Sequence, residues 1–412
     1  MNIKVAIIGG GASGMMAAIN CAYTGAQVVL LERNDRVGKK LLATGNGRCN
    51  YTNENMRMDF LHGEDHQFIE MVMEKFGRDQ TLDFFEKLGI TPANEGDGKI
   101  FPLSFQSSSM LDVLRYEMER TGVEVLTDSY VVEITKKKNF IIRLKTGEAI
   151  EAHRVVLTTG GKAMPVSGSD GNGYSLVKPL GHGTNNITPA LVQLKLEGDK
   201  FKQINGVKFV GRVSLHIDGL PIKEDFGDVL FTDYGISGPP VLQISREAIR
   251  AQEAGRDTRV KVSIISEKSK DEVFSYLRER FENMPERALE FGLIGFINKR
   301  LILPIIKELN LDKYKAVGKL ENREISALAD LLTGWEFQVT GNKGWGQAQT
   351  TAGGIITKDI DPDTMESRLV KGLFLAGEVL DVDGDCGGYN LQWAWSSRYL
   401  AGLSAGAMPR AD

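Results

Sequence analysis

The chain has 412 residues, of which 42% are hydrophobic and 25% are charged, as in ordinary globular proteins. This length exceeds one ordinary hydrophobic core, so we expect two or three domains. The formal net charge of −4, from 54 acidic and 50 basic residues, gives no overall positive field to attract nucleic acid or an anionic membrane surface, and neither is expected as a partner.

The first elements follow the pattern of a βαβ unit. Apolar residues and their spacing predict a strand from Lys4 to Ile8, a helix from Gly14 to Tyr23 and a strand from Gln27 to Glu32. A glycine turn separates the first strand from the helix, and a glycine-rich loop spans residues 38–50. Two strands joined by a helix are expected to pair in parallel.

Further elements complete an α/β pattern in this half of the chain. Helices are expected over residues 66–90 and 107–121. Period-two segments predict strands at Val123 to Leu126, Val131 to Thr135, Phe140 to Lys145 and Ala149 to Thr158. Thr146-Gly147 is the expected hairpin turn between the last two.

From about residue 190 the pattern changes twice. Short alternating segments, Val192 to Leu196 and Arg212 to Ile217, predict a small antiparallel barrel or sandwich. Residues 268–332 have helical spacing, which Pro285 and Pro304 are expected to divide into several short helices. The C-terminal part returns to α/β order, with a strand at Leu373 to Ala376, a glycine-rich turn and a helix from about Asn390 to Ala401.

A dinucleotide-binding fingerprint lies between the first strand and helix. Residues 9–14 read Gly-Gly-Gly-Ala-Ser-Gly, which is G-x-G-x-x-G. We expect Gly9 to make the tight turn, Gly11 to let the backbone approach a pyrophosphate, and Gly14 to allow close contact between helix and strand. Glu32, 18 residues after Gly14, ends the second strand, where its carboxylate can accept hydrogen bonds from both ribose hydroxyls.

The C-terminal region favours FAD over NAD. Gly377-Glu378 follows a short apolar strand, and residues 385–390 (Asp-Cys-Gly-Gly-Tyr-Asn) open a helix. FAD needs a second anchor because its ribityl chain and flavin extend past the pyrophosphate. Glu378 is expected to hold a ribityl or phosphate-side hydroxyl, and the helix N-terminus near Asn390 to face the flavin N1 and C2 carbonyl. A surface loop is the alternative reading.

Further motifs together resemble one known family. They are Gly38-Lys39-Lys40, the segment Thr44 to Asn50 (TGNGRCN), Phe101-Pro102, Phe231-Thr232, Gly235 to Pro239 (GISGP), Gly377 to Asp381 (GEVLD) and Gly387 to Gln392 (GGYNLQ). In combination they resemble the HI0933-like flavoproteins, which include aminoacetone oxidases and bile-acid dehydroxylation oxidoreductases. One departure is Asp233, at a position where the family often has His.

The resemblance implies an α/β fold in which a Rossmann-like FAD-binding domain carries an inserted small β-barrel and a helical subdomain. The expected segments are 1–189 for the first part of the FAD-binding domain, 190–265 for the barrel, 266–332 for the helical insert, 333–347 for the return to the barrel and 348–412 for the second part of the FAD-binding domain. The segmentation by sequence pattern agrees with this order.

The fingerprint and the resemblance together give a set of expected FAD-binding residues. By the resemblance, residues 45–50 lie along the flavin and pyrophosphate, residues 159–161 flank the adenosine end, and Val131 meets the adenine through its backbone. The full set is Gly9, Gly11, Ala12, Ser13, Gly14, Glu32, Arg33, Lys40, Thr44, Gly45, Asn46, Gly47, Arg48, Cys49, Asn50, Val131, Thr159, Gly160, Gly161, Gly377, Glu378, Gly388, Tyr389, Asn390 and Leu391.

The cysteines and histidines provide no evident catalytic group. Cys49 has no partner for a redox pair with four intervening residues, since Thr44 and Glu54 occupy the two positions at that spacing. A buried packing residue is favoured over a single reactive thiol. Cys21 and Cys386 are too distant in sequence for a disulfide framework, and no metal site is expected. His62 and His66, four residues apart, are expected to be a solvated pair.

The flavin is therefore the expected reactive group, in an FAD-dependent oxidoreductase that transfers a hydride between flavin N5 and a small organic or steroid-like substrate. Candidate substrate-side residues are Arg48, Asn50, Thr232, Asp233 and Tyr389. No second nucleotide fingerprint is found, which leaves NAD(P)H open as electron donor. The alternatives are an O₂-using oxidase of a small amine such as aminoacetone and a non-catalytic flavin-binding regulatory protein; an FAD-using nucleic-acid enzyme is disfavoured by charge. The short first apolar run and the lack of roughly 20 consecutive apolar residues favour a soluble, cytoplasmic protein.

Overall fold

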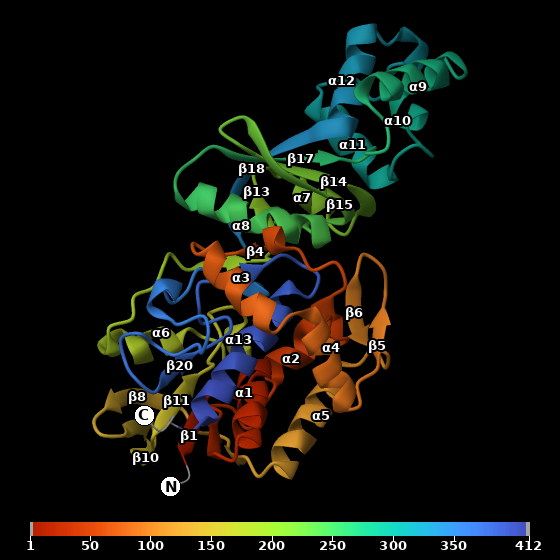
Figure 1. Ribbon diagram of the computed structural model, residues 1–412. Coiled ribbons are helices and arrows are strands. Elements are labelled where there is room, and N and C mark those ends of the chain that lie inside the picture. Colours follow the sequence, from red (N-terminus) through yellow and green to blue (C-terminus); the bar gives the residue numbers. More distant parts are fainter. Residues whose placement is uncertain (1–2, 409–412) are drawn as a thin grey trace. The chain divides into compact units, whose positions relative to one another are not determined.

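The computed structural model describes residues 3–408, so the outermost residues of the first and last expected segments lie outside it. The chain forms two compact units (Figure 1). One contains the chain up to Pro189 together with the chain from Ala348, and the other contains Ala190–Gln347. We refer to them as the nucleotide unit and the inserted unit, and describe each separately.

A parallel five-stranded sheet forms the centre of the nucleotide unit. Its strands are β1 (Lys4–Ile8), β2 (Gln27–Leu31), β7 (Glu124–Leu126), β11 (Arg154–Leu157) and β20 (Leu373–Leu375), in the order β20-β11-β1-β2-β7. All neighbouring pairs are parallel. Both ends of the chain therefore build one Rossmann-like sheet, because β20 pairs with β11 in the register Val155 to Leu373.

Two long helices from opposite ends of the chain lie side by side on this sheet. They are α1 (Ala12–Tyr23) and α13 (Tyr389–Gly406), seen in red and blue in Figure 1. A Cβ atom at Gly402 would lie 2.5 Å from the carbonyl oxygen of Ala17, and one at Gly406 would lie 2.7 Å from that of Cys21. These two glycines, one helical turn apart on α13, thus let the helix backbones approach closely.

The predicted strand from Ala149 to Thr158 is wrong as a single element. It divides into β10 (Ala149–Ala152) and β11, which belong to different sheets. β10 pairs with β9 (Phe140–Leu144), which pairs with β8 (Val131–Lys136), all antiparallel. The chain crosses between the sheets at His153, whose Nδ1 accepts a hydrogen bond from the Lys4 N–H at 2.9 Å.

Two other segments differ from expectation. The helix expected over residues 66–90 is two helices, α3 (His66–Lys75) and α4 (Arg78–Lys87), which separate at Gly77. The loop at residues 38–50 contains a short helix, α2 (Lys39–Ala43), and a 3₁₀ turn at Thr44–Gly47. The other elements of this unit are β3 (Thr52–Asn53), β4 (Leu61–His62), β5 (Pro92–Asn94), β6 (Lys99–Pro102), α5 (Ser107–Arg120), α6 (Asn172–Val177), β12 (Thr188–Ala190), β19 (Thr350–Ala352) and β21 (Asp383–Gly384).

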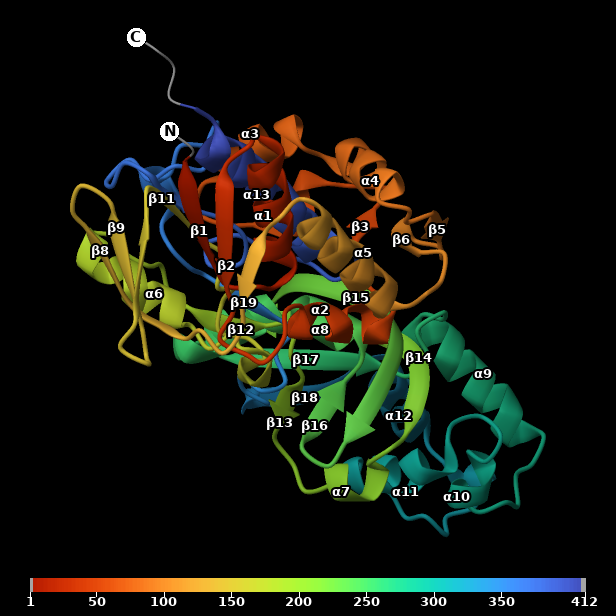
Figure 2. The same cartoon turned by 90° about the horizontal axis from the view of Figure 1, so that it is seen from below.

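The inserted unit contains a closed six-stranded barrel (Figure 2). The strands, in barrel order, are β13 (Leu194–Leu196), β16 (Gly235–Ser237), β15 (Leu220–Thr232), β14 (Lys208–Ile217), β17 (Thr258–Ser263) and β18 (Trp335–Asn342). Phe231, Trp335 and Phe337 contact one another and are buried. The barrel expected from short alternating segments is therefore present, with α7 (Phe201–Ile204) and α8 (Pro239–Glu253) as added helices.

The helical insert lies between β17 and β18 in sequence. It consists of α9 (Lys270–Glu282), α10 (Leu289–Gly292), α11 (Lys299–Glu308) and α12 (Asn322–Gly334). Pro285 falls between helices as expected, but Pro304 lies inside α11, so its predicted interruption is wrong. The buried side chains of Leu301, Ile305 and Ile306 hold this helix against its neighbours, which offsets the one backbone hydrogen bond that a proline removes. Within residues 3–408, no helix has the length and apolar character needed to span a bilayer.

Candidate functional site

The glycine turn between β1 and α1 leaves space for a ligand above Gly11. Gly9 has a φ of +104°, and a Cβ there would lie 2.6 Å from the carbonyl oxygen of Thr158. A Cβ at Gly14 would collide with the carbonyl oxygen of Gly9. A Cβ at Gly11, by contrast, would meet no atom within 4 Å. Gly11 is also the N-cap of α1 and has no side chain to accept from the N–H of Ser13 or Gly14, so the first N–H groups of the helix are available to a phosphate.

Glu32 is fixed beside this turn. Its Oε2 accepts from the Gly10 N–H at 2.8 Å, and its Oε1 accepts from the backbone and the side-chain nitrogen of Asn34 at 2.8 and 2.7 Å. Oε1 thus already accepts two hydrogen bonds, whereas Oε2 accepts one and keeps a second lone pair with which Glu32 can accept a ribose hydroxyl. The Glu32 side chain therefore holds the glycine turn through Gly10 and lies where a ribose is expected.

The end of β11 contains a buried hydroxyl group that no described residue satisfies. Oγ1 of Thr159 is buried without a hydrogen-bond partner among residues 3–408, and a Cβ at Gly173 would collide with it. Gly160, with a φ of +74°, follows. A Cβ at Gly161 would collide with the Thr351 hydroxyl. An unsatisfied buried hydroxyl at the carboxyl end of a Rossmann-type strand fits a nucleotide site.

The expected adenosine end gathers residues from three segments. The Arg33 guanidinium lies 4.4 Å from the centre of the Tyr130 ring and forms an ion pair with Asp170. Asn172 Nδ2 lies 3.4 Å from the carbonyl oxygen of Val131. Arg33 and Val131, two of the expected cofactor residues, thus each contact this group, whereas Tyr130, Asp170 and Asn172 were not among the expected residues.

Lys40 and Glu378 form an ion pair between distant parts of the sequence. Lys40 Nζ lies 2.6 Å from Glu378 Oε2, and both side chains are about one-fifth exposed. Glu378 Oε1 accepts from the Thr351 N–H at 3.0 Å. The two residues were predicted separately as cofactor contacts, and the fold joins them.

The segment from Thr44 to Asn50 has a constrained backbone. Gly45 and Gly47 have positive φ values, as do Asn46 (56°) and Cys49 (62°), which is costly for a residue with a side chain. Burial raises the pKa of the Cys49 thiol to about 12, which agrees with a packing role for this residue. Arg48 forms an ion pair with Glu95 and lies over the Phe101 ring.

Asn50 joins this segment to the start of α13. With its amide nitrogen facing the two carbonyl groups, Asn50 donates to Thr52 O at 2.9 Å and Ile100 O at 3.0 Å, and its oxygen accepts from the Gly388 N–H at 3.2 Å. A Cβ at Gly388 would lie 2.5 Å from Thr52 O. Asn50, which we expected on the substrate side, therefore has its side chain engaged in holding two backbone segments together.

The start of α13 is rigidly held by its side chains. Asn390 donates to Gly384 O at 2.6 Å and accepts from the Gly384 N–H at 2.9 Å, so its amide supports the preceding loop. The Tyr389 hydroxyl donates to Asn55 O at 3.2 Å, and burial raises the pKa of this phenol to about 12. The N-cap Gly388 gives no side-chain cap, and Leu391 is half-buried. The helix N-terminus is thus the part left to interact with a flavin.

A histidine beside this helix start was missed. His62 Nε2 lies 2.8 Å from Asp385 Oδ1. The antiparallel pairing of β4, which contains His62, with β21, which precedes Asp385, brings the two side chains together. The expectation of a solvated His62 and His66 pair is wrong, since His62 is only 16% exposed and hydrogen-bonded, while His66 is exposed at the start of α3. The available signal was Asp385, which lies within the predicted Asp-Cys-Gly-Gly-Tyr-Asn motif.

The chain matches the family described as HI0933-like protein Rossmann domain over residues 3–404. It belongs to this family. The HI0933-like chain is an FAD-dependent oxidoreductase with a Rossmann-like fold, and the open space over Gly11, the uncapped helix start and the unsatisfied Thr159 hydroxyl all fit FAD.

Three relatives are similar to this chain in sequence, and one solved structure is similar in fold. A 3-dehydro-bile acid delta(4,6)-reductase of Clostridium scindens is 39% identical over 98% of this chain and 100% of its own length. Ribosomal RNA dihydrouridine synthases of Haemophilus influenzae and Escherichia coli are 28% and 29% identical over 97% and 95% of both chains. The 3-ketosteroid delta1-dehydrogenase of Sterolibacterium denitrificans shares the fold, with a TM-score of 0.52 at 12% identity, covering 98% of this chain and 99% of that one.

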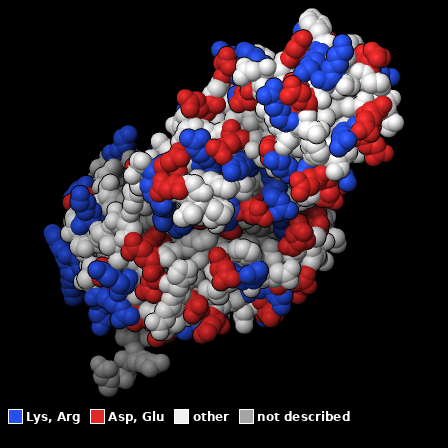
Figure 3. Space-filling view, turned by 90° about the horizontal axis from the view of Figure 1, so that it is seen from above, with Lys and Arg blue, Asp and Glu red and all other residues white. Residues whose placement is uncertain are grey.

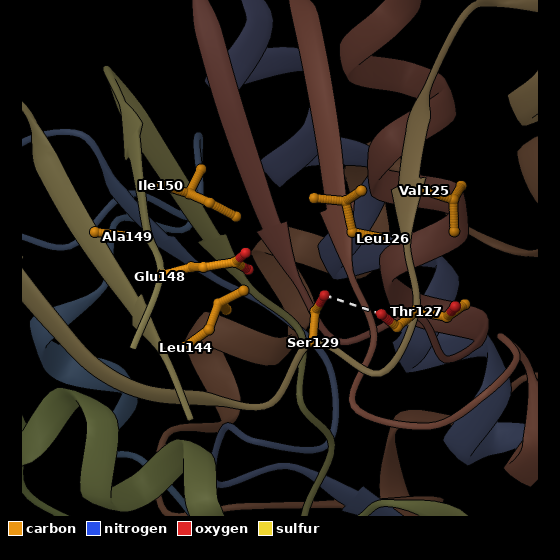
Figure 4. A pocket seen from close by; sticks show the side chains of 8 residues that line it. All are labelled: Val125, Leu126, Thr127, Ser129, Leu144, Glu148, Ala149 and Ile150. Atoms are coloured by element: carbon orange, nitrogen blue, oxygen red, sulfur yellow. Dashed lines mark hydrogen bonds between the residues drawn. The ribbon is translucent and has the colours of Figure 1, made fainter. Parts of the chain in front are cut away.

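The HI0933-like chain also has a cavity of about 640 Å³ that none of the expected cofactor residues lines. It lies between β7 and the β9–β10 hairpin, and Figure 4 shows Leu126 and Ile150 facing one another across it. Glu148 points into it, while Ser129 donates to Thr127 O at 3.0 Å. One carboxylate beside the Thr127 and Ser129 side chains defines no chemistry, so we assign this cavity no function. Thr232 and Asp233, the other expected substrate-side residues, belong to the inserted unit.

Proposed function

We propose that this HI0933-like flavoprotein reduces a carbon–carbon double bond conjugated to a ketone in a steroid-like small molecule, with NAD(P)H as electron donor. The observation that carries the proposal is the 39% identity, over nearly all of both chains, to a 3-dehydro-bile acid delta(4,6)-reductase. A 3-keto group conjugated with double bonds at positions 4 and 6 is an electrophilic acceptor of a hydride. When bound, FAD supplies hydride transfer at flavin N5.

The other two relatives support the same reaction class. Dihydrouridine is uridine saturated at a double bond that is conjugated to a carbonyl group. The names of all three relatives therefore describe saturation of a conjugated double bond, and they differ in the molecule that carries it. This shared chemistry argues for a reductase rather than for an amine oxidase.

Saturation of such a bond also requires a proton at the carbon next to the carbonyl group, and we assign its delivery to His62. The His62 ring is held at Nε2 by Asp385, immediately before the segment that opens α13. It keeps partial exposure, which allows exchange of the proton with solvent. A positioned histidine of this kind is a usual general acid.

Uracil in ribosomal RNA is the second candidate substrate, and the two relatives at 28% and 29% identity favour it. The distribution of charged side chains argues against an RNA substrate. The helical insert, residues 266–332, has 12 basic and 12 acidic residues. On the face seen in Figure 3, Lys and Arg side chains are interspersed with Asp and Glu over most of the surface, and a small group of Lys and Arg lies along its left edge. A surface that binds RNA is expected to concentrate positive charge, so we place the small molecule first.

The same proposal places the protein in the cytoplasm. NAD(P)H is supplied there, and three cysteines in 412 residues are few for a protein of an oxidising compartment. Cys21 and Cys49 are buried, which is typical of thiols that remain reduced.

The test uses the FAD-loaded full chain without oxygen. NADH or NADPH is added, and bleaching of the flavin band is followed by mixing with a 3-oxo-4,6-diene steroid. The expected result is reoxidation of the flavin together with a product two mass units heavier. Parallel samples contain rRNA lacking dihydrouridine, or aminoacetone with O₂. Dihydrouridine formation without steroid reduction would move the substrate to RNA, aminoacetone oxidation alone would make the protein an oxidase, and no turnover with any substrate would favour a regulatory role.

A further inference from the structure

Arg398 on α13 is a buried cation with two side-chain nitrogens that lack hydrogen-bond partners among the described residues. The residue is 2% exposed, and its Nε and Nη1 have no partner among residues 3–408. Its guanidinium lies directly against Gly377, where a Cβ would collide with it. Burial of a guanidinium with two unsatisfied nitrogens is costly, so the fold is expected to retain it only if a further partner binds there.

The contact between α1 and α13 locates Arg398 along the fold. Gly402 contacts the backbone of Ala17, and Gly406, four residues later, contacts that of Cys21, four residues after Ala17. The two helices therefore run in the same direction, with matching turns side by side. Extended by one turn, the same register of Gly402 with Ala17 and Gly406 with Cys21 places Arg398 level with Ser13, in the first turn of α1. This is the turn whose N–H groups lack a side-chain cap and over which the space at Gly11 is open.

The positive charges of Arg398 and Lys40 exceed the negative charge of Glu378, the carboxylate that both of them approach. Glu378, the residue after Gly377, attracts Arg398 but is already engaged by Lys40 Nζ at 2.6 Å and by the Thr351 N–H at 3.0 Å. Two cations thus share one carboxylate beside a helix N-terminus, which itself carries a partial positive charge. A diester of pyrophosphate, with two negative charges, fits this excess.

We propose that Arg398 binds the pyrophosphate of FAD, as a positioning residue that the glycine fingerprint does not include. Arginine suits this role because its planar fork of donors matches phosphate oxygens. Burial lowers the pKa of Arg398 to about 9, so the side chain remains charged at neutral pH. The proposal concerns the cofactor only and does not depend on the identity of the substrate.

The test compares ligands that contain the pyrophosphate with ligands that lack it. Apoprotein of the wild type and of Arg398→Met is titrated calorimetrically with FAD, ADP, riboflavin and adenosine. The variant is expected to bind FAD and ADP roughly tenfold to a hundredfold more weakly, as for the loss of charge-assisted hydrogen bonds, with riboflavin and adenosine unchanged. The melting temperature of the apoprotein is expected to stay equal or rise because an unpaired buried charge is removed.

Arg154→Met is the matched control. Arg154 donates to the carbonyl oxygens of Ser404 and Ala405 at the other end of α13, so its loss should lower stability and leave ADP affinity unchanged. Arg398→Gln provides a second neutral variant should Arg398→Met fail to fold. Unchanged ADP affinity in the folded variant would overturn the proposal, and so would an equal loss of ADP and adenosine binding, which would make Arg398 merely structural.

Discussion

His62 Nε2 and Asp385 Oδ1 lie 2.8 Å apart although 323 residues separate them in the chain. The pairing of β4 with β21 brings them together, and the Asp385 N–H donates to Phe60 O at 2.9 Å. The Asp385 side chain is 5% exposed, so its carboxylate is directed to the imidazole rather than to solvent. A carboxylate in this position fixes the ring orientation and the tautomer of a histidine.

We expect His62→Gln to slow steroid reoxidation of the reduced flavin by roughly a hundredfold or more, the usual contribution of a positioned general acid. FAD affinity and the rate of flavin reduction by NAD(P)H should remain near those of the wild type. Stopped-flow absorbance of the flavin band separates the two half-reactions. His66→Gln, at the exposed histidine four residues later, is the control. Equal rates in His62→Gln and His66→Gln would remove His62 from the mechanism.

Gly11→Ala and Gly14→Ala should have opposite consequences. The added methyl group at Gly11 meets no protein atom within 4 Å, so the stability of the apoprotein should not change while FAD binding weakens about tenfold or more. The methyl group at Gly14 collides with the backbone of Gly9 and should lower the free energy of unfolding by about 3 kcal/mol. Urea denaturation and FAD titration measure both. Tight FAD binding by Gly11→Ala would show that the pyrophosphate lies elsewhere.

Cys49→Ala should retain turnover. The thiol is buried and its pKa is raised to about 12, so little thiolate exists at neutral pH. Loss of the sulfur should cost about 1–2 kcal/mol of unfolding free energy, as for other buried groups of this size. Steady-state rates within twofold of the wild type are expected, and alkylation by iodoacetamide at pH 8 should leave Cys49 unmodified. Abolished turnover in a folded variant would instead indicate a reactive thiol.

The pH dependence of stability should have a contribution from His182. The residue is 3% exposed, its Nε2 lies 2.8 Å from Ser367 Oγ, and burial lowers its pKa below the ordinary 6.5. The folded protein therefore binds this proton less readily than the unfolded chain. Its contribution is present above pH 6.5 and is lost as the pH falls through 6.5 towards the folded pKa, by up to about 1.4 kcal/mol per pH unit.

His182→Gln, which does not titrate, tests this sign. Its unfolding free energy should fall less steeply than that of the wild type when urea denaturation is repeated between about pH 7 and 5. Parallel curves for the two proteins would show that His182 does not change its proton affinity on folding.

The spacing of apolar residues and glycines predicted the strand before the glycine turn and the helix after it to within two residues. The strand from Lys4 to Ile8 has the predicted bounds, and the helix begins at Ala12, two residues before the prediction. Steric demands at Gly9 and Gly14 act over a few residues, which is why a motif can report them. Prediction failed where distant contacts decide the outcome: the segment from Ala149 divides because its two halves join different sheets, and α11 continues through Pro304 because its apolar face is buried.

The sequence by itself determined the family and the cofactor class, because both depend on glycines and motifs read over short distances, and the resemblance to that family implied the two-ended Rossmann-like organisation. Only the tertiary structure paired His62 with Asp385, paired Lys40 with Glu378, engaged the Asn50 side chain between two backbone segments and buried Arg398. The physical reason is that burial and charge pairing depend on residues hundreds of positions apart, and no local pattern carries that information.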